Sequence, residues 1–272
     1  MSHDLAGLRH VVLDLDGTLY RGNRLFEATL PFLAKLQSWK IDYTFLTNNT
    51  SRSKTDYVAK LRNFGIETAE DQIYTPADSA ISYLRRRLPE AKAIAVLGTP
   101  ALCQQFEQAG FRVTWESPQA VIVGFDTTLT YERLCGAAYW ISTGLPFIAT
   151  HPDLVCPTDE PTVLVDCGAI CACLTAATQR SPFVLGKPDP DILLDLCTRH
   201  SLAPPQLAMV GDRIYTDILM AQKAGSLAVL VLSGEATAAD AAALLQPPDL
   251  VVDDVGALGR RMEQARLDIA GR

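Results

Sequence analysis

The sequence predicts an α/β fold: a doubly wound, mainly parallel sheet as the core, with a second, smaller α/β domain inserted into it. Short apolar runs alternate with amphipathic stretches of helical spacing, as in βαβ units. Polar residues directly follow several of these runs, at the sheet edge where α/β proteins bind ligands. The runs with polar ends lie before about residue 80 and after about residue 180, so the segment between them is expected to be the insertion.

The core elements are expected from hydrophobic periodicity. Five apolar runs predict core strands at residues 11–15, 43–46, 183–185, 207–210 and 227–232. Five stretches with helical spacing predict helices at residues 31–39, 53–64, 79–88, 190–200 and 214–224, the last stopped by Gly225. The alanine-rich stretch 236–243 is also expected to be helical.

The inserted segment has strand-like runs at residues 93–97, 120–123 and 147–149 and helical stretches at 102–108 and 131–142. Pro89 and the pair Ser181 and Pro182 suit the crossover points, because proline favours extended or turn conformations. We therefore expect a core domain at residues 1–88 and 181–272 and an inserted domain at residues 89–180.

The composition is that of an ordinary globular protein and argues against two classes of partner. Of the 272 residues 48% are apolar, which is ample for a substantial core. The net charge is -7 and there is no long basic run, so nucleic acid is not an expected partner. No stretch approaches the roughly 18 uninterrupted apolar residues of a membrane helix, so we expect no membrane partner either.

The cysteines and the first residues predict a cytoplasmic protein. Residues 1–4 do not begin a secretory signal, and seven cysteines scattered through apolar segments fit free thiols in a reducing compartment. Cys167, Cys171 and Cys173 leave open a soft-metal site. Their spacing lacks a paired Cys partner or a nearby His, so buried structural cysteines are the favoured interpretation.

Four polar clusters carry the expected chemistry. Asp14 and Asp16 stand where the first apolar run meets a turn, and three later clusters follow further runs: Thr47 with Asn48, Lys187, and Asp212 with Asp217. We expect all four at one sheet edge. Carboxylates from two strand ends can hold a hard divalent cation, which favours Mg²⁺ over zinc. With a lysine charge and a threonine hydroxyl, they predict a phosphate site with a carboxylate nucleophile.

In these motifs the sequence resembles the haloacid dehalogenase superfamily of aspartyl-phosphate phosphatases. The match runs from the Asp14 to Thr18 segment through Thr47 and Lys187 to Asp212, and spans most of the chain. The insertion looks like the cap domain of class IIA, the branch of p-nitrophenyl phosphatases and sugar or nucleotide phosphatases. The resemblance implies that Asp14 becomes the aspartyl phosphate and that Asp16 protonates the leaving oxygen and then deprotonates the hydrolytic water.

The resemblance also implies the ligands. Mg²⁺ would be held by Asp14, the main-chain carbonyl of Asp16 and the carboxylate of Asp212. The Thr47 hydroxyl and the Asn48 amide would bind phosphoryl oxygens, and Lys187 would neutralise the charge that accumulates during transfer.

Two further residues are expected to support these ligands. Asp217 would orient Lys187 or a metal-bound water, and Gly17 would allow the turn that brings the acids together.

Several residues keep two interpretations. One interpretation makes Asp126 and His151 residues of the cap domain that select the substrate; in the other, Asp126 caps a helix and His151 is solvent-exposed. Relatives commonly carry Asn where His151 stands. The arginines at 85–87 are expected on a solvated helix face, and His3, His10 and His200 are expected to be structural or incidental.

The expected function is a cytoplasmic, Mg²⁺-dependent phosphomonoesterase acting on a small phosphorylated metabolite such as a sugar phosphate or nucleotide. The resemblance also implies a homodimer formed through the cap. The alternatives are a receiver-like phospho-acceptor, a non-catalytic metabolite-binding protein and, more remotely, a hydrolytic dehalogenase.

Overall fold

The chain divides into two compact units in the computed structural model, which describes residues 5–49, 53–157 and 162–270. The core unit lies within residues 1–47, 58–74 and 187–272, and the inserted unit lies within residues 48–57 and 75–186. This division differs from the expected boundaries at residues 89 and 181. Helix α3 (Pro76–Arg87) belongs to the inserted unit, because Ala77, Ala80 and Leu84 pack against that unit's sheet.

The core unit is built on a six-stranded sheet in which every pair of neighbours is parallel. The order across the sheet is β15 (Leu250–Val252), β14 (Leu227–Val231), β13 (Leu207–Gly211), β1 (His10–Asp14), β4 (Asp42–Leu46) and β5 (Ile73–Tyr74). In this order β1 lies between β13 and β4, with Leu13 opposite both Val210 and Phe45. The expected strands of this sheet before residue 80 and after residue 200 are therefore confirmed.

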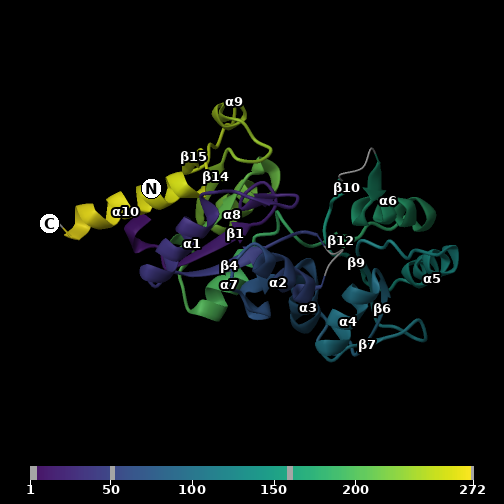
Figure 1. Cartoon of the computed structure of the whole chain (residues 1–272). Coiled ribbons are helices and arrows are strands. Elements are labelled where there is room, and N and C mark those ends of the chain that lie inside the picture. The colour runs from purple at the N-terminus through teal and green to yellow at the C-terminus, as the bar shows by residue number, and fades with distance from the viewer. Residues whose placement is uncertain (1–4, 50–52, 158–161, 271–272) are drawn as a thin grey trace. The chain divides into compact units, whose positions relative to one another are not determined.

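Helices complete the core unit (Figure 1). They are α1 (Thr29–Ser38), α2 (Lys54–Asn63, which begins in the inserted unit), α7 (Asp191–His200), α8 (Leu219–Ala224), α9 (Ala238–Ala242) and α10 (Val255–Ala270). Leu196 of α7 and Met220 of α8 are buried in one cluster with Val12 and Met209 of the sheet. Gly225 ends α8 with a φ of 71°, as the helix stop predicts.

Some core elements were not expected from the sequence. A short hairpin, β2 (Tyr20–Arg21) and β3 (Arg24–Leu25), follows the first strand. A π-helical turn (Ile214–Ile218) precedes α8, and short 3₁₀ turns lie at Leu5–Gly7, Glu70–Gln72 and Pro204–Gln206. Strands of two or three residues, such as β5 and β15, are too short to produce a period-2 pattern.

The inserted unit has its own sheet of five parallel strands. Their order is β12 (Phe183–Val184), β9 (Phe147–Ala149), β8 (Val121–Val123), β6 (Ala93–Leu97) and β7 (Arg112–Val113). One expectation is wrong here. The run at 183–185 is not a strand of the core sheet, because Phe183 pairs with Ile148 and Val184 with Ala149 at the edge of the inserted sheet.

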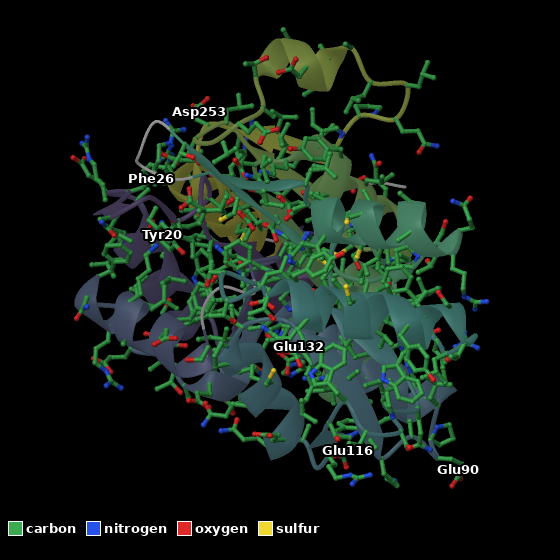
Figure 2. The ribbon with its side chains drawn as sticks, turned by 90° about the vertical axis from the view of Figure 1, so that its right-hand side faces the viewer. Tyr20, Phe26, Glu90, Glu116, Glu132 and Asp253 are labelled. Atoms are coloured by element: carbon green, nitrogen blue, oxygen red, sulfur yellow. The ribbon has the colours of Figure 1, made fainter. Side chains whose placement is uncertain are left out.

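The two faces of the inserted sheet are covered by different helices, since successive strand residues point to opposite faces. Ile94 and Val96 pack with α3 and α4 (Pro100–Gln108), whereas Ala95 and Leu97 pack with α5 (Tyr131–Ser142) and α6 (Cys167–Thr178). An antiparallel hairpin, β10 (Val155–Pro157) and β11 (Val163–Val165), precedes α6. Figure 2 shows Glu90, Glu116 and Glu132 on the outer surface of this unit.

Helix α3 begins with a capping box formed by Thr75 and Asp78. Thr75 precedes Pro76, and both the Thr75 amide and hydroxyl donate to Asp78 Oδ2, at 2.8 and 2.9 Å. Such a capping box with proline in the first turn fixes a helix start. The helix therefore starts three residues earlier than its apolar spacing indicates.

The packing of α3 on the inserted sheet predicts the effect of a truncation. Leu84 is fully buried against Ile94 and Phe106, so Leu84→Ala should cost about 2–5 kcal/mol of unfolding free energy through the cavity it leaves. Urea unfolding followed by circular dichroism measures it. Arg87→Ala, on the exposed side of the same helix, is the control and should change stability by less than about 0.5 kcal/mol. Equal small effects from both variants would contradict the packing.

Candidate functional site

Three of the four expected clusters leave the core sheet at adjacent strand ends. Asp14 is the last residue of β1, Thr47 follows β4, and Asp212 follows β13. Because these strands are parallel neighbours, their carboxyl ends meet at one edge. Asp14 and Thr47 are each 8% exposed and Asp212 is 2% exposed, so this edge is a nearly enclosed polar site.

Lys187 reaches the site by another route than expected. The preceding strand β12 belongs to the inserted unit, so Lys187 stands on the segment that re-enters the core unit rather than at the end of a core strand. Its ammonium nevertheless lies between two carboxylates, 2.5 Å from Asp14 Oδ1 and 2.7 Å from Asp217 Oδ1. Lys187 is 4% exposed and Asp217 is fully buried, so both ion pairs are shielded from water.

The charges in this cluster change one another's protonation. Burial alone lowers the pKa of the Lys187 ammonium, but the charges of Asp14 and Asp217 outweigh it and raise that pKa above its usual value. Burial raises the pKa of Asp217 to about 6, with Lys187 opposing the rise. Lys187 is therefore held as a cation in the site.

Asp212 is the most crowded carboxylate of the site. Its Oδ2 accepts a hydrogen bond of 2.7 Å from the Glu235 amide. A Cβ on Gly17 or Gly234 would overlap this carboxyl group, and one on Gly211 would overlap that of Asp217. Gly17 also has a φ of +87°, which disfavours any other residue. A glycine is therefore needed at position 17 for two reasons: it allows the expected turn, and it leaves room for the Asp212 carboxyl group.

The donor set fits a hard cation. Oxygens of Asp14, Asp212 and Asp217 lie within 4.8 Å of one another, and no His or Cys is among them. Asp212 Oδ1 is buried and has no hydrogen-bond partner among the described residues. Burial, followed by the charges of Asp14 and Asp217, raises the pKa of Asp212 to about 7. Carboxylate oxygens crowded in this way are the ligands that Mg²⁺ prefers.

Asp16 lies differently from Asp14. It is exposed, and its Oδ2 accepts a hydrogen bond of 3.3 Å from the Gly22 amide of the β2–β3 hairpin. The buried Thr18 hydroxyl donates to Asp14 Oδ2 at 3.3 Å, which fixes the other oxygen of Asp14. The two acids of the Asp-x-Asp motif are therefore one enclosed and one accessible to solvent.

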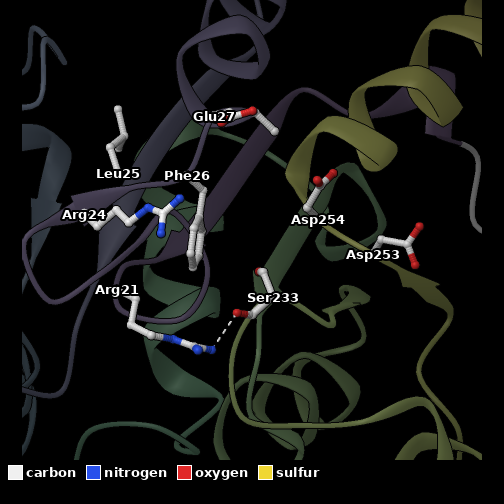
Figure 3. Close-up of a pocket in the computed structure, with 9 residues that line it drawn as sticks. Arg21, Arg24, Leu25, Phe26, Glu27, Ser233, Asp253 and Asp254 are labelled. Carbon is white, nitrogen blue, oxygen red and sulfur yellow. Dashed lines mark hydrogen bonds between the residues drawn. The ribbon is translucent and has the colours of Figure 1, made fainter.

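A second set of residues, not expected from the sequence, holds the loop that contacts Asp212. Arg21 Nη2 donates to the carbonyls of Ser233 and Gly234, at 2.8 and 3.2 Å, and the Ser233 hydroxyl donates to the Gly17 carbonyl at 2.7 Å. Figure 3 shows the Arg21 to Ser233 bond beside a pocket of about 530 Å³ that Arg24 and Phe26 also line. The polar residues after the predicted strand at 227–232 are the signal that could have indicated this loop.

The remaining expected site residues lie in the inserted unit. Asn48 follows Thr47 in the chain, and its side-chain oxygen would stand 3.0 Å from a Cβ on Gly186, whose φ is +79°. Asp126 is 6% exposed; its Oδ1 accepts from the Thr128 amide at 2.8 Å and its Oδ2 lies 2.8 Å from Arg133. The N-cap residue of α5 is Thr130, so Asp126 does not cap this helix.

His151 is fully buried, so its interpretation as a solvent-exposed residue is wrong. Its Nδ1 lies 3.7 Å from Asp153 and its Nε2 lies 3.5 Å from Asp166, the N-cap residue of α6. Burial lowers the pKa of His151 to about 4 despite the charge of Asp153. Burial also raises the pKa of Asp166 to about 6.

Other expectations concern cysteines, arginines and membranes. Cys167 and Cys171 are buried and Cys173 is exposed. The arginines at 85–87 are exposed, as expected. Among residues 5–49, 53–157 and 162–270, no helix combines the length and the apolar content needed to cross a bilayer.

Comparison with known proteins decides the family. Residues 11–112 match the family model of haloacid dehalogenase-like hydrolases, and residues 184–258 match a HAD-hydrolase-like model. Ribonucleotide monophosphatase NagD of Escherichia coli K12 is 32% identical over 84% of this chain and 88% of its own length. The chain belongs to the haloacid dehalogenase-like hydrolases. Its similarity to such relatives places it in the class IIA branch, as the motifs indicate.

Solved structures of similar proteins agree with this assignment. A 4-nitrophenylphosphatase from Thermotoga maritima superposes with a TM-score of 0.89 at 37% identity, covering 95% of this chain and 98% of that one. A glycerol phosphate phosphatase from Mycobacterium tuberculosis, solved in complex with magnesium, gives 0.87 at 29% identity and covers 96% and 79%. The expected enzyme class of this haloacid dehalogenase-like hydrolase, phosphoric monoester hydrolase, is confirmed by relatives that are named as phosphatases.

The buried imidazole of His151 predicts a pH dependence of stability. The unfolded chain binds a proton at this residue below about pH 6.5, whereas the folded chain does so only near pH 4, so stability falls as the pH is lowered between these values. His151→Asn removes this loss. When the pH is lowered from about 7.5 to about 5, the difference in unfolding free energy between His151→Asn and wild type should therefore shift by about 2 kcal/mol in favour of the variant. Urea unfolding in chelator measures both proteins; a constant difference across this range would contradict the buried neutral state.

Proposed function

We propose that this hydrolase cleaves small phosphomonoesters in a Mg²⁺-dependent reaction through a covalent aspartyl phosphate on Asp14. The observation that carries the proposal is the buried cluster at the core-sheet edge, in which Lys187 contacts Asp14 and Asp217 and an oxygen of Asp212 lacks a hydrogen-bond partner among the described residues. A carboxylate nucleophile, a fixed cation and an oxygen-only metal site are the parts that phosphoryl transfer requires.

In the first half-reaction Asp14 attacks the phosphorus, so that a carboxylate oxygen to phosphorus bond forms and the ester oxygen to phosphorus bond breaks. Thr18 fixes one oxygen of Asp14, which leaves the group oriented for attack. The exposed Asp16 donates its proton to the leaving oxygen. Lys187 neutralises charge on the transferring group, and Thr47 with the Asn48 amide binds its oxygens.

In the second half-reaction Asp16, now a carboxylate, takes a proton from water as that water attacks the phosphorus. The bond to Asp14 breaks, and inorganic phosphate leaves. Asp217 keeps Lys187 in place through their 2.7 Å contact. One acid thus serves both halves of the cycle, which requires its carboxyl group to stay accessible to solvent.

Asp14, the main-chain carbonyl of Asp16 and Asp212 would hold Mg²⁺. The cation supplies charge compensation that allows an anionic nucleophile to approach an anionic phosphate. A magnesium complex of a glycerol phosphate phosphatase with the same fold supports this choice.

The inserted unit would select the ester, with Asp126 and His151 as its candidate residues. NagD is named for ribonucleotide monophosphates and a relative from Gallus gallus for glycerol 3-phosphate, so a small phosphorylated metabolite is the proposed partner class. A cytoplasmic location is part of the proposal, because cysteines scattered through apolar segments fit a reducing compartment. A homodimer through the inserted unit remains a proposal that rests on the resemblance alone.

Hydrolysis of p-nitrophenyl phosphate tests the mechanism. Activity should require Mg²⁺ and vanish with chelator or with Asp14→Asn, and Asp16→Ala should lower kcat about 10²–10⁴-fold. Acid quenching followed by mass spectrometry should detect one phosphoryl group on Asp14. Asp71→Asn, an exposed acid elsewhere on the core unit, is the control. Turnover that persists in Asp14→Asn would reject the covalent route, and a stable phosphoprotein without turnover would favour the receiver-like alternative.

The bonds from Arg21 to the loop at 233–235 predict a selective effect on the metal. Arg21→Met releases the loop whose amide contacts Asp212, so the Mg²⁺ concentration for half-maximal activity should rise about 10–100-fold. The KM for substrate at saturating Mg²⁺ should change by less than about twofold, because the hydrogen bonds of Arg21 go to this loop. Arg24→Met, on the same hairpin, is the control. A change in KM alone would contradict this role.

A further inference from the structure

Three metal-ligating side chains meet at the end of the core sheet opposite the phosphatase site. His10 is the first residue of β1, whereas Asp14 is its last. Asp42 begins β4 directly opposite His10, and His200 is the last residue of α7. One ligand atom from each of these residues lies within 4.8 Å of the other two. Their elements converge here, although the three residues are far apart in the chain.

His10 is already held as a metal ligand would be. It is 1% exposed, and its Nε2 lies 2.9 Å from the Thr44 hydroxyl. Its Nδ1 is buried without a hydrogen-bond partner among the described residues, which is a costly state for a polar atom. With the proton on Nε2, facing Thr44, Nδ1 presents a lone pair. Metal-ligating histidines commonly bond their second ring nitrogen in this manner.

We propose that His10, Asp42 and His200 form a binding site for a borderline divalent transition metal, with Zn²⁺ as the best match. Two imidazoles and one carboxylate, with water in the fourth position, suit tetrahedral Zn²⁺. Bonds of about 2.1 Å in that geometry separate the ligand atoms by about 3.4 Å. Asp42 and His200 are exposed and can make this adjustment, while His10 stays fixed in the strand.

The ring of His200 supports the same arrangement. Its centroid lies 4.2 Å from that of His10, with the planes tilted by 39°. The two rings are therefore close enough for one nitrogen of each to bind the same cation. The sequence-based expectation that His10 and His200 are merely structural is replaced by this proposal; His3 lies outside the described residues.

Two other clusters could compete for the metal, and their chemistry differs. Asp14, Asp212 and Asp217 offer only oxygens, which favour Mg²⁺ over zinc. In the cluster of His151, Asp153 and Asp166, the two acids face different ring nitrogens, and a metal bound at one nitrogen cannot use both acids at their present positions. The His10 site therefore has the best donor set for Zn²⁺ among the described residues.

Binding at this site would join the end of α7 to the beginnings of β1 and β4. Since α7 starts at Asp191, shortly after Lys187, the metal would anchor the far end of the segment that brings the lysine to the core unit. A ligand that binds only the folded chain stabilises it in proportion to its occupancy.

The test uses the full-length protein in saturating Mg²⁺ with micromolar Zn²⁺ added. Calorimetric titration should give one Zn²⁺ per chain, and Tm should rise. His200→Gln and Asp42→Asn, both at exposed positions, should each weaken binding at least about tenfold. Co²⁺ in place of Zn²⁺ should give the visible absorption of a tetrahedral nitrogen-containing site, and His200→Gln should abolish it.

Matched variants locate the metal. His151→Gln and Asp212→Asn each disable a competing cluster, and both should bind Zn²⁺ as wild type does. Binding that survives His200→Gln and Asp42→Asn, or that disappears in His151→Gln or Asp212→Asn, would overturn the proposal. So would the lack of any Zn²⁺ binding at micromolar concentration. Circular dichroism of each variant separates loss of the site from loss of the fold.

Discussion

The buried Lys187 ammonium between Asp14 and Asp217 is the interaction on which the rest of the core unit depends. An unpaired charge at this depth costs several kcal/mol, so removal of either partner leaves a strongly unfavourable group. With Asp212 nearby, however, three carboxylates face one lysine. Burial, followed by this excess negative charge, accounts for the raised pKa values of Asp212 and Asp217, and the excess charge creates the demand for a divalent cation.

The sequence was sufficient where the chemistry follows strand geometry. A parallel sheet brings the carboxyl ends of its strands to one edge, so apolar runs followed by polar residues predict that Asp14, Thr47 and Asp212 lie together. Gly17 could be recognised because a tight turn follows the first of these runs. Its second task, making room for the Asp212 carboxyl group, involves a residue almost 200 positions away and has no local signature.

Other features depend on pairings that no local pattern encodes. A two-residue strand at 183–184 can join either sheet, and hydrogen bonding to β9 decides for the inserted one. Helix α3 has an apolar face that suits either unit, and the contacts of Ala77, Ala80 and Leu84 assign it to the inserted one. Arg21 is one exposed arginine among many until its bonds to Ser233 and Gly234 are seen. Likewise His10 and His200 are remote in sequence and adjacent only in the fold.

The register of β1 has a consequence for biosynthesis. Its neighbour β4 follows after the β2–β3 hairpin and α1, but its other neighbour β13 begins only at Leu207, which pairs with His10. A ribosome must therefore finish most of the polypeptide before the central strand can be flanked on both sides. The intervening sheet, by contrast, closes within a continuous stretch of chain. Contacts between distant segments form slowly, and domains usually fold as units during synthesis, so the nascent protein acquires its inserted module first and its nucleophile-bearing layer last.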